Sequence, residues 1–181
     1  GIHDGHNASA CLLEDGKVLA AIGEERLTRN KHQYGFPFKS IDKVLAISNT
    51  CINEIDKVAM ATKTLPPRYF LTQRNCNFSI EDYWIEQREY WYPLLIEGKK
   101  ANYTEIFKKH IHRDKFPYDS NLIKHEDDHK GMWSARKKHL SEYLNIDKQK
   151  IEVHDHHNCH ASYGFATSNL FAKKPLLVFT I

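Results

Sequence analysis

Apolar runs separated by short polar segments predict β-structure over residues 1–30. A first strand ends at Ile2 or His3 and is followed by a polar loop. Two further apolar runs are joined by Asp15-Gly16. This dipeptide favours a two-residue hairpin turn, because both central residues of such a turn take positive φ. The expected order is therefore strand, loop, strand, turn, strand.

The pattern changes after this segment. Apolar positions from Ile41 to Leu45 recur at helical spacing, and Asn49 stands where a helix would stop, so we predict a helix within 37–50. A short and nearly continuous apolar run at 55–62 is typical of a central strand. The first third of the chain thus predicts the order βββαβ.

Residues 64–150 differ in composition and predict a helical insertion between two strands. Within it, 126–144 favours a helix, although Gly131 weakens that prediction. The segment is rich in aromatic residues, for which we expect packing between helices rather than stacking on a substrate. These residues are Tyr83, Trp84, Tyr90, Trp91, Tyr92, Tyr103 and Phe107.

The last part of the chain predicts a strand at 150–155, a helix that opens at a histidine cluster, and a buried strand at 175–180. The first residues lie in a strand that has already begun, and the last lie in a strand with nothing after it. We therefore expect an N-terminal fragment of a longer protein. Taken together, the elements predict an α/β fold with a mixed sheet.

Composition narrows the class of protein. The chain has 181 residues, of which 41% are apolar and 27% charged, which is ordinary for one globular domain or part of a larger one. A net charge of +3 is too weak to indicate nucleic-acid binding. No apolar run reaches the roughly 18–20 residues of a membrane span. The four cysteines form no CxxC pair, so we expect reduced thiols and a cytoplasmic protein.

The histidine cluster, HDHHNCHASYGF, holds four of the twelve histidines within seven positions. If Asp155 caps a helix, His156 and His160 lie on one face and can reach one divalent metal. His157 and His160 form a second possible pair. The alternative is a set of histidines that make local hydrogen bonds. Two histidines do not complete a metal site, so a carboxylate or a third imidazole must come from elsewhere.

A second polar group, HDGHNAS, follows the first strand. Asp4 followed by Gly5 can present a carboxylate and backbone N–H groups to a phosphate or a metal. His6 can act as a general base if it faces the same cleft. A polar turn, in which Asn7 and Ser9 bond their own backbone, is the alternative.

A third group, EERLTRNKHQYG, combines two carboxylates with the cationic residues Arg26, Arg29 and Lys31 and with His32. These charges could bind a phosphorylated or acyl substrate. Charge runs of this kind more often form a solvated rim, which is the interpretation we favour.

Three motifs together resemble a known family. D-G-H-N-A-S-A, E-E-R-x-T-R-x-K-H and D-H-H-x-x-H-A occur in the order and approximate spacing of the N-terminal domain of the O-carbamoyltransferases, which include nodulation-protein-U-like and antibiotic-modifying enzymes. The aromatic segment EYWYPLLIEGKKANYTEIF also resembles an insertion of the nodulation-protein-U-like branch. The resemblance extends over essentially the whole chain.

The resemblance implies a fold and a reaction. It implies an actin/Hsp70-like ATPase (RNase H-like) subdomain related to the tRNA threonylcarbamoyltransfer subunit. A separate C-terminal YrdC-like domain would convert carbamoyl phosphate and ATP into carbamoyl adenylate. The N-terminal domain would then pass the carbamoyl group to a hydroxyl of a small molecule or sugar, with a divalent metal, Fe²⁺ first among the candidates, in its cleft.

The resemblance also assigns roles to residues. His156 and His160 match the metal-binding histidines, His6 matches the base that deprotonates the acceptor, and Asp4 matches the acidic residue beside it. The residues that we expect to contact ATP or carbamoyl adenylate are Gly5, Asn7, Ser9 and Lys31.

Further metal ligands would lie beyond residue 181, so we expect the fragment alone to be inactive. We expect no nucleic-acid or membrane partner, and a homodimer is an open alternative. Two other functions also stay open, namely threonylcarbamoyl transfer to tRNA, for which a more basic surface without the aromatic insertion is expected, and a non-catalytic metal-binding module.

Overall fold

The computed structural model describes residues 1–61, 63, 66–111, 116–168 and 177–180. Within them, one mixed sheet has the strand order β3-β2-β1-β4-β5. Strand β1 pairs antiparallel with β2 and parallel with β4, β2 pairs antiparallel with β3, and β4 pairs parallel with β5. The mixed sheet predicted from the sequence is confirmed. The strands are β1 (Ile2–His3), β2 (Ser9–Glu14), β3 (Lys17–Gly23), β4 (Val58–Ala61) and β5 (Ile151–His154).

The predicted hairpin is confirmed. Asp15 and Gly16 both take positive φ, at 48° and 78°, as the two-residue turn between β2 and β3 requires. The prediction of β-structure as far as residue 30 is wrong, because helix α1 (Glu24–Thr28) follows β3 directly. The physical reason is the side chain of Glu24, which is buried and binds another helix. The backbone therefore turns into a helix at Glu24 and does not continue the strand.

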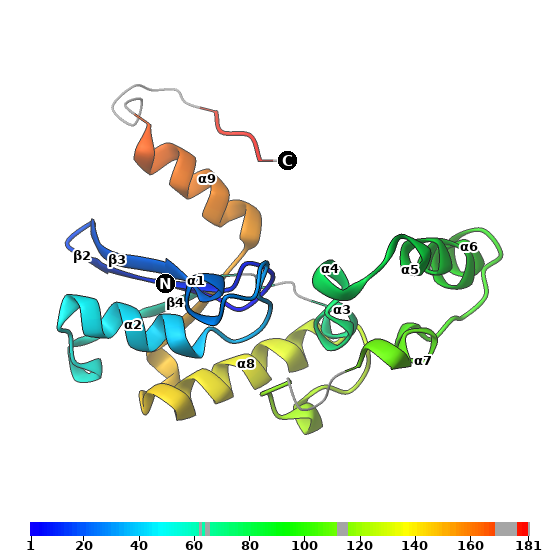
Figure 1. The fold of residues 1–181 in the computed structure, drawn as a ribbon, viewed down its shortest axis with the longest axis horizontal. Coiled ribbons are helices and arrows are strands. Elements are labelled where there is room, and N and C mark those ends of the chain that lie inside the picture. Colours follow the sequence, from blue (N-terminus) through cyan, green and yellow to red (C-terminus); the bar gives the residue numbers. More distant parts are fainter. Residues whose placement is uncertain (62, 64–65, 112–115, 169–176, 181) are drawn as a thin grey trace.

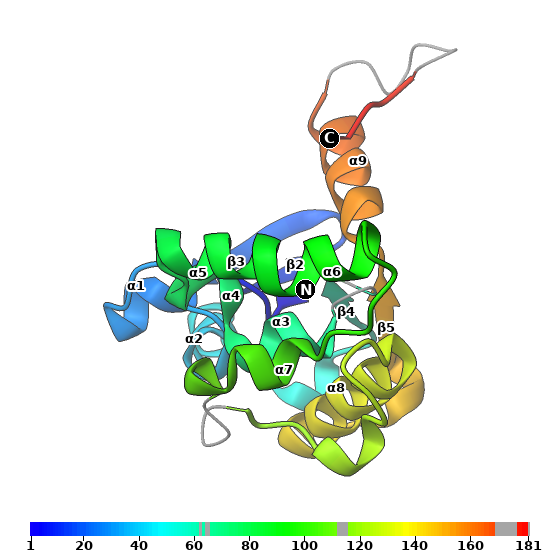
Figure 2. The same ribbon diagram turned by 90° about the vertical axis from the view of Figure 1, so that its right-hand side faces the viewer.

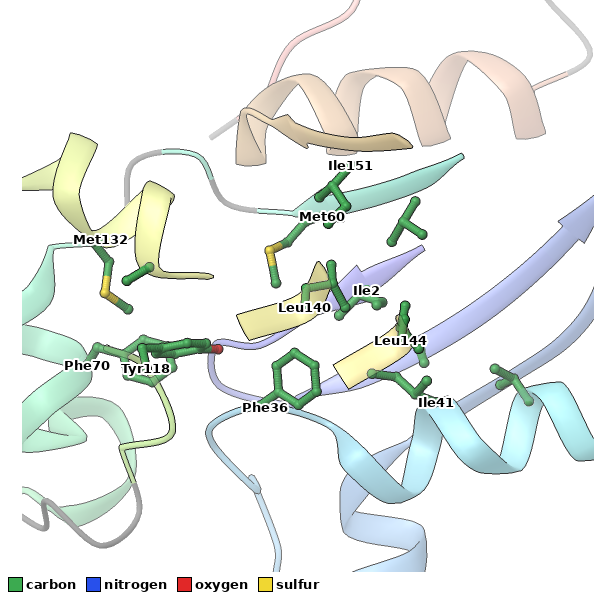
Figure 3. Packing of buried hydrophobic residues seen from close by; sticks show 14 of the residues in the cluster. Ile2, Phe36, Ile41, Met60, Phe70, Tyr118, Met132, Leu140, Leu144 and Ile151 are labelled. Carbon is green, nitrogen blue, oxygen red and sulfur yellow. The ribbon is translucent and has the colours of Figure 1, made fainter. Parts of the chain in front are cut away.

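Helices α2 (Phe38–Ser48) and α8 (His129–Leu144) cover one face of the sheet (Figure 1). Both agree with the predicted helices, and Asn49 ends α2 in the left-handed conformation. The Tyr143 hydroxyl of α8 donates to the Asp42 carboxylate of α2 at 2.7 Å. Figure 3 shows the core between the two helices and the sheet, with Met60 and Leu140 at its centre.

The stretch between the parallel strands β4 and β5 is largely helical, as predicted. Helices α3 to α7 lie beyond the end of the sheet, across from the hairpin turn (Figure 1). That 64–150 forms an insertion in a parent fold stays a prediction. Among the described residues of this stretch before α8, the helices are α3 (Pro67–Thr72), α4 (Arg74–Asn77), α5 (Ile80–Ile85), a π-helical segment (Glu86–Trp91), α6 (Tyr92–Leu95), α7 (Tyr103–Ile106) and two short 3-10 helices (Lys108–His110 and Ser120–Leu122).

The aromatic residues of this stretch form a second, smaller core. Tyr90, Tyr103 and Phe107 are buried against one another, which confirms packing between helices for these three. Trp91 packs against this core and is partly buried. Tyr83, Trp84 and Tyr92 are exposed instead, so the same interpretation does not extend to them.

Helix α9 (His156–Thr167) follows β5 and projects away from the rest of the described chain in both views (Figure 1 and Figure 2). The strand predicted at 175–180 falls partly on 175–176, outside the described residues. Residues 177–180 are not in a strand, so that part of the prediction is wrong. An apolar run forms a strand only when it has a pairing partner, and no pairing joins 177–180 to the described strands.

Within the part of the chain that the structure describes, no helix combines the length and the apolar character needed to cross a membrane.

Candidate functional site

The sheet brings two predicted motifs, the HDGHNAS loop and the histidine cluster, to the same end of its parallel strands. Strands β1, β4 and β5 run parallel, and the register places His3, Ala61 and His154 side by side at their carboxyl ends. The loop after β1 and helix α9 after β5 therefore start from neighbouring positions. In open sheets with parallel strands, ligands bind at this edge.

Asp4 lies at the root of the loop and is completely buried. Its Oδ2 accepts a hydrogen bond from the Tyr118 hydroxyl at 2.5 Å and another from Arg136 Nε at 2.7 Å. Arg136 Nη2 donates to Oδ1, so both carboxylate oxygens are occupied. Burial, together with the negative charge of Asp4, raises the pKa of the Tyr118 hydroxyl well above its usual value and keeps it a donor.

His6 is exposed at the tip of this loop, where its backbone forms a β-bridge with Tyr34. Its carbonyl oxygen lies 3.0 Å from Nε2 of His3. Because a carbonyl oxygen only accepts, the proton of neutral His3 resides on Nε2. Burial lowers the pKa of His3, so its imidazole is neutral at neutral pH. The His6 imidazole therefore lies at the surface of a braced loop, where it is accessible to a substrate.

The histidine pair on α9 has the predicted geometry. The Asp155 carboxylate caps the helix by accepting from the backbone N–H of His157 at 3.0 Å and of Asn158 at 3.2 Å. Nε2 of His156 lies 3.0 Å from Nε2 of His160. Burial and the neighbouring imidazoles lower the pKa of His156, which favours the neutral form that binds metals.

His3 links the two motifs. Its ring centroid lies 6.0 Å from that of His6 and 6.2 Å from that of His156. The loop and α9 thus meet across one half-buried imidazole. The structure therefore brings the predicted base and the predicted metal ligands into one neighbourhood.

The two α9 imidazoles fit a divalent metal as a pair. Nitrogens 3.0 Å apart can both reach one ion at the usual bond length of about 2.0–2.1 Å. Among the described residues, no group of three or more His, Cys, Asp or Glu side chains is arranged to hold a metal. A bound metal would therefore need ligands from outside the described residues.

The residues predicted to contact the nucleotide are only partly brought together. Gly5 is buried, and a Cβ atom there would lie 2.9 Å from the His3 ring. Asn7 Oδ1 and His32 Nδ1 are 3.0 Å apart, which joins the loop to the charged segment that carries Lys31. Lys31 lines a polar cavity of about 420 Å³, whereas Ser9 lines a more apolar cavity of about 490 Å³ between the sheet and α9.

The charged segment divides into two parts. Arg26, Arg29 and Lys31 are exposed, as expected for a solvated rim. Glu24 is buried, and its carboxylate accepts from the backbone N–H groups of Lys39 and Ser40 at 3.1 and 2.7 Å. Glu24 therefore caps the start of α2 from a neighbouring helix.

Sequence reasoning missed four side chains that shape this region, namely His3, Glu24, Tyr118 and Arg136. His3 and Glu24 lie inside motifs that the sequence singled out. Tyr118 and Arg136 lie 114 and 132 residues from Asp4, in a stretch without a recognisable motif. Only the fold shows that they bind the same carboxylate.

The sequence is similar to a known protein family over its whole length. Residues 1–181 match the family model described as carbamoyltransferase N-terminus. A nodulation protein, NolNO, of Sinorhizobium fredii is 34% identical over 134 residues, which cover 72% of this chain. An uncharacterized protein of Methanocaldococcus jannaschii is 56% identical over 45 residues, 25% of this chain. An uncharacterized 19.2 kDa protein of Rhizobium etli is 36% identical over 76 residues, 42% of this chain.

The matched regions span 17%, 9% and 39% of the lengths of these three relatives, respectively. The family match extends over all three motifs and over the helical stretch between β4 and β5. The chain belongs to the carbamoyltransferase N-terminus family.

Proposed function

We propose that the full-length protein transfers a carbamoyl group from carbamoyl adenylate to a hydroxyl of a small molecule or sugar. The observation that carries the proposal is the meeting of His6 and the His156–His160 pair around His3, in a chain that belongs to a carbamoyltransferase family. Family membership supports carbamoyl transfer in general. The exposed imidazole of His6 supports a hydroxyl as the acceptor, because a hydroxyl is a weak nucleophile that needs a base.

In the proposed step, the acceptor oxygen attacks the carbonyl carbon of carbamoyl adenylate. A carbon–oxygen bond forms, the bond from that carbon to the phosphate oxygen breaks, and AMP leaves with the bonding electrons. The acceptor proton passes to a ring nitrogen of His6. Carbamoyl adenylate itself would form from carbamoyl phosphate, ATP and water in a C-terminal YrdC-like domain, with release of inorganic phosphate and pyrophosphate.

His156 and His160 would hold the divalent metal, with Fe²⁺ as our first candidate. When bound, it would polarise the carbamoyl oxygen or anchor a phosphate. The remaining ligands would come from a later part of the chain, which is why we propose that residues 1–181 are inactive alone.

We also propose that the sheet is part of an actin/Hsp70-like ATPase (RNase H-like) domain. The antiparallel unit β1–β3, followed by the parallel strands β4 and β5, supports this proposal. Contacts of the nucleotide with Gly5, Asn7, Ser9 and Lys31 belong to the same proposal. Gly5 and Asn7 lie on the loop that carries His6.

The test uses the full-length protein with carbamoyl phosphate, ATP and a panel of acceptors that includes sugars, aminoglycosides, polyketide alcohols and tRNA. Mass spectrometry should detect one acceptor that gains a carbamoyl group while ATP is converted to AMP. Carbamoylation of a small hydroxyl compound supports the proposal. A threonylcarbamoyl product on tRNA, or metal binding without any turnover, would contradict it.

A further inference from the structure

The carboxylate of Asp4 joins three separate parts of the chain. Tyr118 and Arg136 bind it from 114 and 132 residues away, and all three side chains are buried. Asp4 stands two residues before His6. Whatever fixes Asp4 therefore fixes the start of the loop that carries the proposed base.

Arg136 also acts on the neighbouring strand. Its Nη2 donates to the carbonyl oxygen of Ala61 at 2.7 Å, and Ala61 pairs with His3 across β4 and β1. One guanidinium thus binds the ends of two parallel strands from beneath the site. A planar guanidinium suits this task, because its donors lie in a fixed fork.

The far side of the loop is held by other contacts. His3 bonds the carbonyl oxygen of His6, and the His6 backbone pairs with Tyr34. The loop is therefore fixed at its root by Asp4 and at its tip by His3 and Tyr34. Neither Tyr118 nor Arg136 is required for these contacts at the tip.

We infer that Tyr118 and Arg136 are positioning residues, which hold the His6 loop in its reactive orientation through the shared carboxylate of Asp4. The expected change in kcat rests on the proposed function, whereas the expected change in loop order does not. A displacement of about 1 Å between reacting groups lowers the rate by up to about a hundredfold. Loss of one bond to Asp4 should therefore lower kcat while substrate binding changes little.

The test compares Tyr118→Phe with Tyr143→Phe in the full-length protein. Both tyrosines donate to a carboxylate, at 2.5 Å to Asp4 and at 2.7 Å to Asp42, but Tyr143 lies away from the loop. Amide hydrogen exchange reports the loop directly, without any turnover. We expect faster exchange confined to residues 5–9 in Tyr118→Phe only.

The kinetic arm measures kcat and KM with the acceptor identified as above. We expect kcat to fall about tenfold in Tyr118→Phe, as for loss of one charge-assisted hydrogen bond, with KM for carbamoyl phosphate unchanged. Arg136→Lys, which keeps the charge but not the fork, should act in the same direction. It replaces Tyr118→Phe if that variant does not fold.

Equal exchange at residues 5–9 in both tyrosine variants would overturn the inference. Faster exchange over the whole chain, or a raised KM with unchanged kcat, would also overturn it, since either result indicates a structural or a binding role. If the wild-type protein transfers no carbamoyl group, the proposed function fails, and the exchange measurement still decides the positioning role.

Discussion

Asp4 and Arg136, which are 132 positions apart in the sequence, form a fully buried ion pair between the end of β1 and the middle of α8. Two charges removed from water are stable only when each satisfies the other. Here each side chain supplies the opposite charge and the hydrogen bonds that the other needs. The pair thereby ties the helical stretch to the sheet at the candidate site.

Asp4→Asn should lower the free energy of unfolding by about 3–5 kcal/mol, because it leaves the Arg136 charge buried without a counter-charge. Lys57→Met is the matched control, since Lys57 and Glu152 pair at 2.7 Å on the exposed surface. We expect the control to cost about 0–1 kcal/mol. Urea unfolding of both variants measures the difference. Equal losses of unfolding free energy would show that the buried pair contributes no more to stability than the exposed one.

Gly131→Ala should destabilise the protein by about 1–3 kcal/mol, the usual cost of overpacking. Gly131 is buried in the first turn of α8, and a Cβ atom there would collide with the Leu122 carbonyl and the Asp128 carboxylate.

Gly164→Ala is the control for this substitution. Gly164 lies inside α9, and a Cβ atom there would meet nothing within 4 Å among the described residues. Alanine should stabilise this helix by about 0.5–1 kcal/mol. Thermal unfolding followed by circular dichroism compares the two. Stabilisation by both alanines would refute the steric assignment at Gly131.

His139 should make stability depend on pH. Its ring packs against those of Phe36 and Tyr118, and burial lowers the pKa of His139 below its ordinary value of 6.5, with Glu142 and Asp4 acting in the opposite direction. Just below pH 6.5 the unfolded chain therefore binds more protons than the folded protein. The free energy of unfolding should fall as the pH drops through this range.

His139→Phe removes this titration but keeps an aromatic ring. Urea unfolding between about pH 7 and pH 5 should then show a smaller loss of stability in the variant than in the wild-type protein. A loss of equal size in both would assign the pH dependence to other groups.

Much of the fold could be predicted from the sequence because its signals are local. The hairpin turn requires positive φ, which Asp15 and Gly16 both adopt. The apolar spacing from Ile41 to Leu45 indicates a helix without reference to other parts of the chain. The prediction was wrong beyond Gly23, where the buried contacts of Glu24 with α2 decide the structure. Such a contact between distant residues leaves no periodic trace in the sequence.

In the candidate site too, some features could be predicted from the local sequence and others depend on the fold. The Asp155 cap follows from the preference of Asp for helix starts, and the His156–His160 pair follows from helical spacing. The structure confirms both. The environment of Asp4 does not follow from spacing, because Tyr118 and Arg136 reach it only once the chain has folded. The roles of the site residues in catalysis and metal binding stay predictions.

His160→Ala should lower the affinity of the full-length protein for a divalent metal by about tenfold or more, because it removes one of the two proposed ligands. His157→Ala is the control, since His157 is exposed on the same helix but is not part of the 3.0 Å pair. Elemental analysis after dialysis against Fe²⁺ measures both. Equal metal content in the two variants would remove His160 from the set of ligands.

The most direct test of the role of His6 is His6→Asn in the full-length protein, measured for adenylate formation and carbamoyl transfer in one reaction. Asparagine keeps a polar side chain at the exposed tip of the loop but cannot take a proton at neutral pH. We expect that carbamoyl adenylate still forms at the wild-type rate and that transfer to the acceptor hydroxyl is lost. Transfer at the wild-type rate, or equal loss of both activities, would contradict the role of His6 as the base.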